Sequence, residues 1–228
     1  MFARYAIYYA PKPGHPLAKF GTSWLGWDIH TACTVAHPVI PGFEFNIEAL
    51  SAVPRKYGFH GTLKAPFYLA EGKTEEELIN VVQSFATRQK SFEIGRLRVN
   101  NLGGFIALTQ ITPNDQLAQF AGKCVVELDE FRAPMTATDI KRRLQAKLST
   151  RQEHLMRTWG YPYIMDEFRF HLTLTGRLNG DAISSVQIAL TKHLAFILKA
   201  PVWLFDMCLC GQNKNGNFQI IERFPLAP

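Results

Sequence analysis

The chain is poor in cysteine and has neither a long apolar run nor a large excess of one charge. Its four cysteines are too few and too scattered for a disulfide framework. They are Cys33, Cys124, Cys208 and Cys210. No apolar stretch approaches the roughly 20 residues of a membrane-spanning helix, and the first residues lack the apolar run of a signal peptide. We therefore expect a soluble, cytoplasmic protein that does not enter a membrane.

Several cofactor and catalytic patterns are also missing. The sequence has no Gly-x-x-x-x-Gly-Lys loop, no Gly-x-Gly-x-x-Gly, no His-Glu-x-x-His and no Gly-x-Ser-x-Gly. We expect no cofactor and no metal. The net charge of +6 favours anionic ligands, although solvated surface charge explains it equally well. With 228 residues, 47% of them hydrophobic, the chain is long enough for a sizeable core.

One short motif is present twice, once in each half of the chain. Residues 60–63 read His-Gly-Thr-Leu and residues 171–174 read His-Leu-Thr-Leu. The surrounding residues 59–67 and 167–178 are rich in strand formers, so we expect both copies on strands. Side chains alternate between the two faces of a strand. Each histidine therefore shares a polar face with the threonine two residues later, while the apolar residues between them face a core.

Two histidines with two hydroxyl groups suit chemistry on a phosphodiester. Histidine titrates near pH 6.5, so a neutral imidazole can accept a proton while an imidazolium protonates the leaving oxygen. His60 and His171 are the candidates for this catalytic pair. Thr62 and Thr173 are candidates to bind the phosphate, because hydroxyl groups donate to its non-bridging oxygens.

Weaker candidates lie beside the motifs. Lys64, Arg169 and Arg177 occupy the same polar faces and would add positive charge toward a substrate, and Tyr57 precedes the first motif. Lys64, Arg169 and Arg177 are each equally well explained as solvated surface residues, and Tyr57 is a weaker candidate than these three. We name them as further contacts to the substrate.

The order of the expected elements favours an α+β fold with mostly antiparallel sheet. Hairpins and helices are mixed, without a strict strand–helix repeat. We expect helices over residues 114–130, 139–148, 151–159 and 181–198, and a helix that begins after a capping box at Thr74 and Glu77. Residues 31–54, which contain several prolines, are expected to form a loop with short elements.

At these residues the sequence resembles the two-histidine (2H) phosphoesterases, which carry paired His-x-Thr/Ser-hydrophobic motifs. The resemblance is strongest to the branch encoded in phosphonate-degradation operons and runs along nearly the whole chain. The segments that carry it are residues 4–11 (Arg-Tyr-Ala-Ile-Tyr-Tyr-Ala-Pro), 24–26 (Trp-Leu-Gly), 57–64, 128–134, 159–163 and 167–178.

The resemblance implies a bilobal, pseudo-symmetric fold in which two mostly antiparallel sheets line a central cleft with helices outside. Residues 1–228 would form this single domain, with one motif in each lobe. It also implies His60 and His171 as catalytic residues and Thr62 and Thr173 as phosphate binders. The expected function is a metal-independent phosphoesterase that hydrolyses a cyclic phosphate or phosphodiester, in phosphonate metabolism.

Three other interpretations remain open from the residues. The chain is an RNA-end 2′,3′-cyclic phosphodiesterase or ligase, with Trp159, Tyr161 and Tyr163 available to stack on bases. In a second interpretation the chain is a non-catalytic protein that binds a phosphorylated metabolite. Or His60 and His171 hold a metal, for which the sequence offers no convincing further ligand. We favour a small-molecule phosphate ester over RNA as the partner. The sequence is compatible with a monomer and leaves the oligomeric state open.

Overall fold

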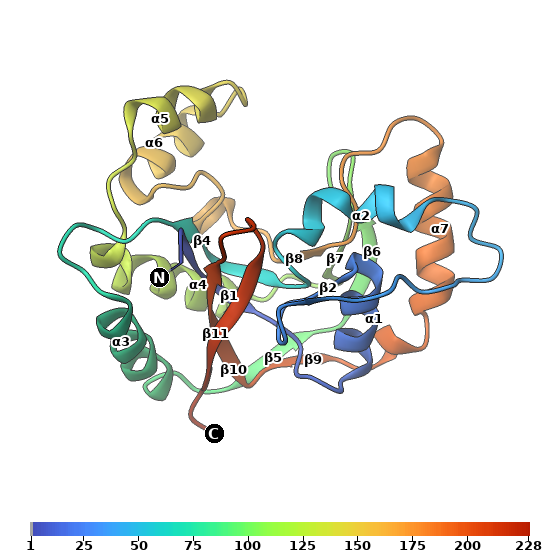
Figure 1. Ribbon diagram of the computed structural model, residues 1–228, viewed down its shortest axis with the longest axis horizontal. Coiled ribbons are helices and arrows are strands. Elements are labelled where there is room, and N and C mark those ends of the chain that lie inside the picture. The colour runs from blue at the N-terminus through green and yellow to red at the C-terminus, as the bar shows by residue number, and fades with distance from the viewer. Residues whose placement is uncertain (1) are drawn as a thin grey trace.

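The computed structural model describes residues 2–228 and has seven α-helices in that part of the chain (Figure 1). These are α1 (Pro16–Leu25), α2 (Ile47–Arg55), α3 (Glu75–Thr87), α4 (Asp115–Glu127), α5 (Ala137–Leu144), α6 (Thr150–Trp159) and α7 (Ala182–Leu194). Short 3₁₀ helices span Asp129–Phe131, Met165–Glu167 and Ile197–Lys199. No helix within residues 2–228 combines the length and the apolar character needed to cross a membrane.

The strands form one large sheet and two small ones. The large sheet has seven strands in the order β11-β10-β1-β4-β8-β7-β6, and all its neighbours are antiparallel. Its members are β1 (Tyr5–Tyr9), β4 (Gly61–Phe67), β6 (Leu97–Asn101), β7 (Ile106–Gln110), β8 (His171–Thr173), β10 (Asp206–Gln212) and β11 (Phe218–Pro225). The small sheets pair β2 (Trp27–Asp28) with β3 (Cys33–Thr34), and β5 (Phe92–Gly95) with β9 (Val202–Leu204).

The predicted α+β class with mostly antiparallel sheet is confirmed. The two sheets expected to line the cleft are joined into one, because β4 and β8 pair through Gly61 and Leu172. That single residue pair connects the four strands β11, β10, β1 and β4 to the three strands β8, β7 and β6. The two motif strands are therefore direct neighbours at the centre of the sheet.

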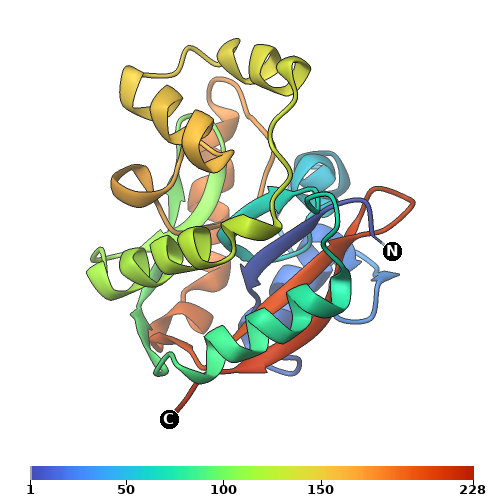
Figure 2. The same cartoon turned by 90° about the vertical axis from the view of Figure 1, so that its left-hand side faces the viewer.

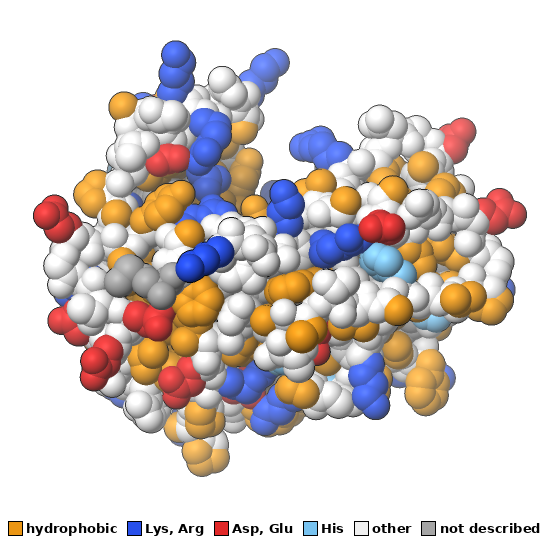
Figure 3. Space-filling view, in the orientation of Figure 1, with side chains coloured by type: hydrophobic (Ala, Val, Ile, Leu, Met, Phe, Trp, Pro, Cys, Tyr) orange, Lys and Arg blue, Asp and Glu red, His pale blue; other side chains and the backbone are white. Residues whose placement is uncertain are grey.

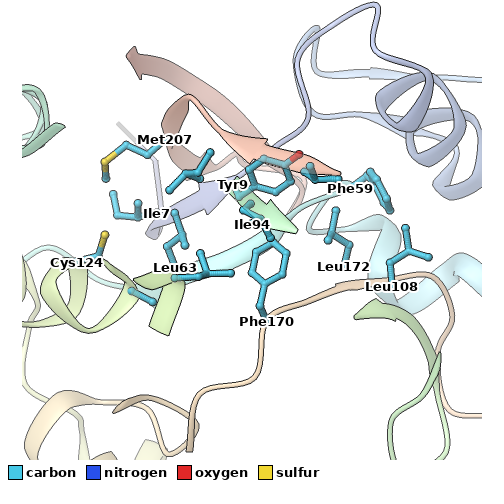
Figure 4. Close-up of a cluster of buried hydrophobic side chains, with 14 of the residues drawn as sticks. Ile7, Tyr9, Phe59, Leu63, Ile94, Leu108, Cys124, Phe170, Leu172 and Met207 are labelled. Carbon is cyan, nitrogen blue, oxygen red and sulfur yellow. The ribbon is translucent and has the colours of Figure 1, made fainter. Parts of the chain in front are cut away.

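The main hydrophobic core lies on one face of this sheet. Ile7 and Tyr9 point into it from β1, and Leu63 and Leu172 point into it from the motif strands (Figure 4). Tyr5 of β1 belongs to the same cluster. Helices α3, α4 and α7 supply the opposite wall of this core (Figures 1 and 2). The alternate residues of β1 belong to a separate, smaller cluster on the other face of the sheet. The alternation along β1 thus separates the main core from the face that carries the site.

Close packing at Gly61 holds the two motif strands together. The ring of Phe170 lies directly over Gly61, and a Cβ atom built there would approach the Phe170 ring to 2.3 Å. Tyr9 contacts the same ring edge-on, with the ring centroids 5.8 Å apart. Gly61 is therefore required for the close approach of β4 and β8, since any side chain there would push Phe170 away.

Helix α2 corrects the expectation of a loop over residues 31–54. The Asn46 side chain accepts a hydrogen bond from the Ala49 N–H and caps this helix. The proline within the helix, Pro54, lies in its last turn. Pro54 has no N–H to donate to the Leu50 carbonyl, and the Gly176 N–H donates to that carbonyl instead, at 2.8 Å. The carbonyl group that the proline leaves free therefore connects α2 to the chain just after the second motif.

The second motif strand is shorter than the residues 167–178 expected for it. Only His171–Thr173 pair as a strand, and Met165–Glu167 form a 3₁₀ turn. Beyond the strand, the Trp24 indole N–H donates to the Leu174 carbonyl at 2.7 Å. Tertiary hydrogen bonds hold this end of the motif in place of further strand pairing.

Helices α5 and α6 form an arch that stands away from the sheet, at the upper left in Figure 1. The sequence predicts helices over residues 139–148 and 151–159. Both helices are present, but α5 begins earlier and ends at Leu144. Thr136 and Ser149 cap them, the second with a full capping box. Helix α5 has no buried residue. The arch therefore forms one wall of the hollow seen beside it in Figure 3.

Candidate active site

The two motifs lie side by side, in opposite directions, on β4 and β8. Gly61 pairs with Leu172, and both face the main core. Continuing this antiparallel register by one residue on each side sets Thr62 opposite His171 and Thr173 opposite His60. Directly opposed residues of such strands have Cβ atoms about 5 Å apart. All four polar residues of the motifs thus share one small area of the sheet.

Each histidine is held by a hydrogen bond from Nδ1 to the backbone carbonyl two residues earlier. Nδ1 of His60 lies 2.9 Å from the Gly58 carbonyl oxygen, and Nδ1 of His171 lies 2.7 Å from the Arg169 carbonyl oxygen. A carbonyl oxygen only accepts, so Nδ1 carries the proton in each ring. In the neutral state Nε2 is then an unprotonated base on both histidines.

His60 is packed more closely than its counterpart. Its ring stacks on Tyr8 with centroids 3.6 Å apart, and its Nε2 lies 3.1 Å from Thr62 Oγ1, which donates to it. Burial lowers the pKa of His60 to about 4, and the charge of His171 acts in the same direction. His60 is therefore neutral near pH 7.

His171 lies on the side of β7 and has a more open environment. It pairs with Thr109 across β7, and its ring centroid lies 5.9 Å from that of Phe105. Burial also lowers the pKa of His171 from its usual 6.5. Both imidazoles are therefore mainly neutral near pH 7, which differs from the expected combination of one neutral and one protonated histidine in the free protein.

Two buried hydroxyl groups without a protein partner flank the histidines. They belong to Tyr8, which stacks on His60, and Thr109, which pairs with His171. Within residues 2–228 these are the only buried side-chain nitrogen or oxygen atoms that lack a hydrogen bond. Burying an unpaired hydroxyl costs about 1–3 kcal/mol. The two costs fall at matching places in the two halves of the site.

A cavity of about 470 Å³ opens beside the motif residues. Thr62 and His171 line it, together with Arg169, which lies just before β8. The turn between β6 and β7 and the chain that follows α6 supply the remaining wall, with Asn101, Gly103, Phe105, Tyr161, Tyr163 and Phe168 among its residues. Cavities of this size hold small ligands.

The weaker candidates divide between the site and other surroundings. Arg169 lines the cavity. Tyr57 lies beside His60, with ring centroids 6.4 Å apart, and lines a neighbouring cavity. Arg177 is exposed and donates to the Gly103 carbonyl at 3.3 Å, so it supports the β6–β7 turn that borders the site.

Lys64 is a correction, because it does not reach the cavity. Its side chain is buried, with 3% of the residue exposed. The ammonium group donates to the Val125 carbonyl at 2.9 Å and pairs with Asp129 at 3.3 Å. The end of α4 covers this part of β4 and presents unpaired carbonyl groups, which attract a cation. Lys64 therefore joins the strand to the helix.

Sequence reasoning missed Tyr8 and the residues from the chain after α6. Tyr8 lies in a run of strand formers, where nothing distinguishes it from Tyr5 or Tyr9. For Trp159, Tyr161 and Tyr163 the sequence suggests only a role in stacking on bases. Of these, Tyr163 is exposed and lines the cavity, whereas Trp159 packs against a small cluster behind it. Over residues 2–228 there is no group of three or more His, Cys, Asp or Glu side chains arranged to hold a metal.

Comparison with known proteins gives the family of the chain. Residues 62–219 match the family described as protein of unknown function, DUF1045. The chain belongs to this family. Two curated relatives carry the name "Ribose 1,5-bisphosphate phosphokinase PhnN". The protein from Janthinobacterium sp. (strain Marseille) is 39% identical over 98% of this chain and 51% of its own length. The protein from Laribacter hongkongensis (strain HLHK9) is 35% identical over 87% of this chain and 46% of its own length.

The chain thus spans about half the length of these two relatives. Among solved structures, E. coli LigT in its apo form is 13% identical, with a TM-score of 0.46 and coverage of 100% of this chain and 99% of that one. A structure described as a phosphoesterase is 12% identical, with a TM-score of 0.45 and coverage of 99% of each chain.

Proposed function

We propose that this DUF1045 protein is a phosphoesterase that hydrolyses a cyclic phosphate or phosphodiester by general acid–base catalysis with His60 and His171. The observation that carries the proposal is the matched pair of histidines. Both are tied at Nδ1 to a backbone carbonyl, so that Nε2 is the unprotonated nitrogen in each neutral ring. The motif strands adjoin at Gly61 and Leu172, and Thr62 and His171 line one cavity.

The reaction needs one neutral and one protonated imidazole. Nε2 of the neutral histidine removes a proton from water while the water oxygen forms a bond to phosphorus. The bond between phosphorus and the leaving oxygen breaks, and the Nε2 proton of the imidazolium goes to that oxygen. The product is a phosphomonoester, and the two histidines have exchanged protonation states. The Thr62 and Thr173 hydroxyl groups donate to the non-bridging oxygens.

Binding of the substrate supplies the required imidazolium. The free protein keeps both histidines neutral because each ring is largely removed from water. A phosphodiester carries a negative charge, and a nearby opposite charge favours the protonated form of an imidazole. The substrate therefore raises the pKa of the histidine beside the leaving oxygen and draws in a proton.

A cyclic phosphate of a pentose is the substrate class we favour. The cavity of about 470 Å³ suits a small ester better than a nucleic acid. The curated relatives are named for a ribose bisphosphate, and a sugar cyclic phosphate fits a neighbouring step of phosphonate metabolism. An RNA end is the alternative, because the exposed Tyr163 offers a ring for stacking at the cavity edge.

The test is hydrolysis of a panel of esters in the presence of EDTA. The panel contains ribose 1,2-cyclic phosphate, nucleoside 2′,3′-cyclic phosphates and oligoribonucleotides with a 2′,3′-cyclic end. Wild type is compared with His60→Ala and His171→Ala, and with His154→Ala as a control on the exposed face of α6.

Turnover by wild type and His154→Ala that is lost in both motif variants supports the two-histidine reaction. Turnover that survives in either motif variant contradicts it. A wild-type protein that binds a member of the panel without hydrolysing it would instead be a phosphometabolite-binding protein. Loss of turnover on adding EDTA would revive the metal alternative.

A further inference from the structure

A second cavity, of about 490 Å³, adjoins the site beneath the arch of α5 and α6. Tyr163 lines both cavities, and Tyr57, which lies beside His60, lines the second one. Arg4, Arg142 and Arg143 also line it. They come from the approach to β1 and from the last turn of α5. In Figure 3, Lys and Arg side chains gather along the hollow under this arch.

Two of these arginines make no ion pair with a carboxylate in the described part of the chain. Within residues 2–228 neither Arg4 nor Arg143 forms an ion pair, whereas Arg142 pairs with Asp139 at 2.6 Å. No Asp or Glu is among the residues that line the cavity. The cavity therefore holds two guanidinium groups that are not paired with a carboxylate.

Neutral partners hold both guanidinium groups in position. Arg4 Nε donates to the Gln212 side-chain oxygen at 2.7 Å, and its guanidinium lies 5.6 Å from the centre of the Phe218 ring. The Arg143 guanidinium lies 4.9 Å from the centre of the Tyr161 ring. These contacts orient the groups and leave their charge available, which is how arginine is prepared to bind phosphate.

The Tyr8 hydroxyl is an independent sign of a ligand on this side. It is fully buried and has no hydrogen-bond partner within residues 2–228. The Tyr8 ring packs against Phe218, and the same Phe218 ring contacts Tyr57 and the Arg4 guanidinium. The unpartnered hydroxyl therefore lies near the groups that border the two cavities.

The basic end of α5 has another explanation, which covers only part of the observation. Lys141, Arg142 and Arg143 occupy its last turn, where cations interact favourably with the helix dipole. That effect does not account for Arg4, which belongs to a different part of the chain and lines the same cavity.

We propose that the cavity beneath the arch binds a second phosphate group of the substrate, a phosphomonoester, through Arg4 and Arg143. The inference rests on the proposed function, because it extends the substrate of the His60–His171 site. The substrate class is then a small sugar that carries a cyclic phosphate and, elsewhere on the same sugar, a phosphomonoester. Because the two cavities meet at Tyr163, one sugar bridges them.

The test compares two substrates that differ only in the second phosphate. They are ribose 1,2-cyclic phosphate and its 5-phosphorylated form. Wild type, Arg4→Gln, Arg143→Gln and the control Arg157→Gln, which is on the same arch and pairs with Glu153, are each assayed for kcat/KM on both. We expect wild type and the control to prefer the 5-phosphorylated ester by at least about tenfold. We expect each of the other two variants to lose ten- to a hundredfold on that ester, so that the preference falls toward one.

Equal use of both esters by wild type, or a preference unchanged in Arg4→Gln and Arg143→Gln, overturns the second phosphate site and leaves the proposed function standing. If neither ester is turned over, the proposed function fails, and binding decides the site separately. The probe is then ribose 5-phosphate, titrated calorimetrically with ribose as the reference. A Kd at least tenfold weaker in Arg143→Gln than in Arg157→Gln supports the site, and equal values overturn it.

Discussion

The two His-x-Thr-Leu segments are nearly identical in sequence, yet the structure gives their histidines different surroundings. His60 follows a tight turn, stacks on Tyr8 and accepts a hydrogen bond from Thr62. His171 begins a three-residue strand and has Phe105 and Thr109 as its neighbours. The shared feature is the tie of Nδ1 to the carbonyl two residues earlier. The motif therefore determines the orientation of the ring, and the neighbouring strands determine its burial.

The largest expected effect tests whether the two histidines are equivalent in catalysis. His60→Ala and His171→Ala each lower turnover by at least ~100-fold, because each removes one proton transfer. His60→Ala also lowers the free energy of unfolding, by about 1–3 kcal/mol and by more than His171→Ala does, since it removes a closely stacked ring. Steady-state kinetics and thermal unfolding, with His154→Ala as the control, measure both. Full activity in either variant would contradict a catalytic role for the histidine that it lacks.

The two threonines give the next effect. Thr62→Val and Thr173→Val each lower kcat by about 10- to 100-fold, because a hydrogen bond to the charged phosphate is lost. Thr62→Val also removes the donor to His60 Nε2, so it alone changes the titration of His60. NMR titration of the imidazole signals, read beside kcat, checks both parts. A shift of His60 in the Thr173 variant alone would contradict the assignment.

The pH dependence sharpens the comparison further. Burial sets the pKa of His60 at about 4 and that of His171 below 6.5 in the free protein. We therefore expect a bell-shaped kcat/KM with its maximum between about pH 4 and 6.5, and a tenfold fall per pH unit above that range. The optimum of kcat lies at higher pH, because the bound phosphate raises the histidine pKa. A kcat/KM that stays flat up to pH 8 excludes this scheme.

The same pKa shift makes stability depend on pH. The unfolded chain protonates His60 below about pH 6.5, whereas the folded protein does so only near pH 4. The stabilisation is therefore complete above pH 6.5 and is lost as the pH falls toward 4, by about 1.4 kcal/mol per pH unit for this group. Denaturant unfolding of wild type and His60→Gln over this range isolates the contribution.

Gly61 is where the two motifs touch, and its replacement tests their contact. Gly61→Ala should lower the free energy of unfolding by about 1–3 kcal/mol, because the new Cβ meets the Phe170 ring. Gly122→Ala is the matched control, because it lies in α4 and its Cβ meets only the flexible Met165 sulfur at 3.3 Å. Denaturant unfolding compares them. Equal stability of Gly61→Ala and wild type would mean that the strands tolerate separation.

The smallest effect concerns the two unpartnered hydroxyl groups. Tyr8→Phe and Thr109→Val each remove a buried hydroxyl without a protein partner, so the free energy of unfolding should change by less than about 1 kcal/mol or rise. A cost above 2 kcal/mol in either variant would show that the hydroxyl has a partner in the folded protein. Thermal unfolding of the two variants beside wild type provides the measurement.

The local elements were largely predictable from the sequence. Thr74 and Glu77 form the expected capping box, and the apolar spacing after Asn114 yields α4. Alternation along the motif segments placed His60 with Thr62 and His171 with Thr173, and the hydrogen-bonded sheet keeps these pairs on one face. Such features depend on neighbours two to four residues apart, which a sequence displays directly.

Only the tertiary structure decided how these elements meet. The pairing of Gly61 with Leu172 joins into one sheet the two sheets that the family resemblance implied. The carbonyl groups at the end of α4 bury Lys64, which alternation alone had assigned to the cleft. Arg4 and Arg143 line one cavity although they are far apart in the sequence. Side-chain periodicity specifies which face a residue occupies, whereas long-range packing and desolvation determine what covers that face, and these depend on contacts between distant segments.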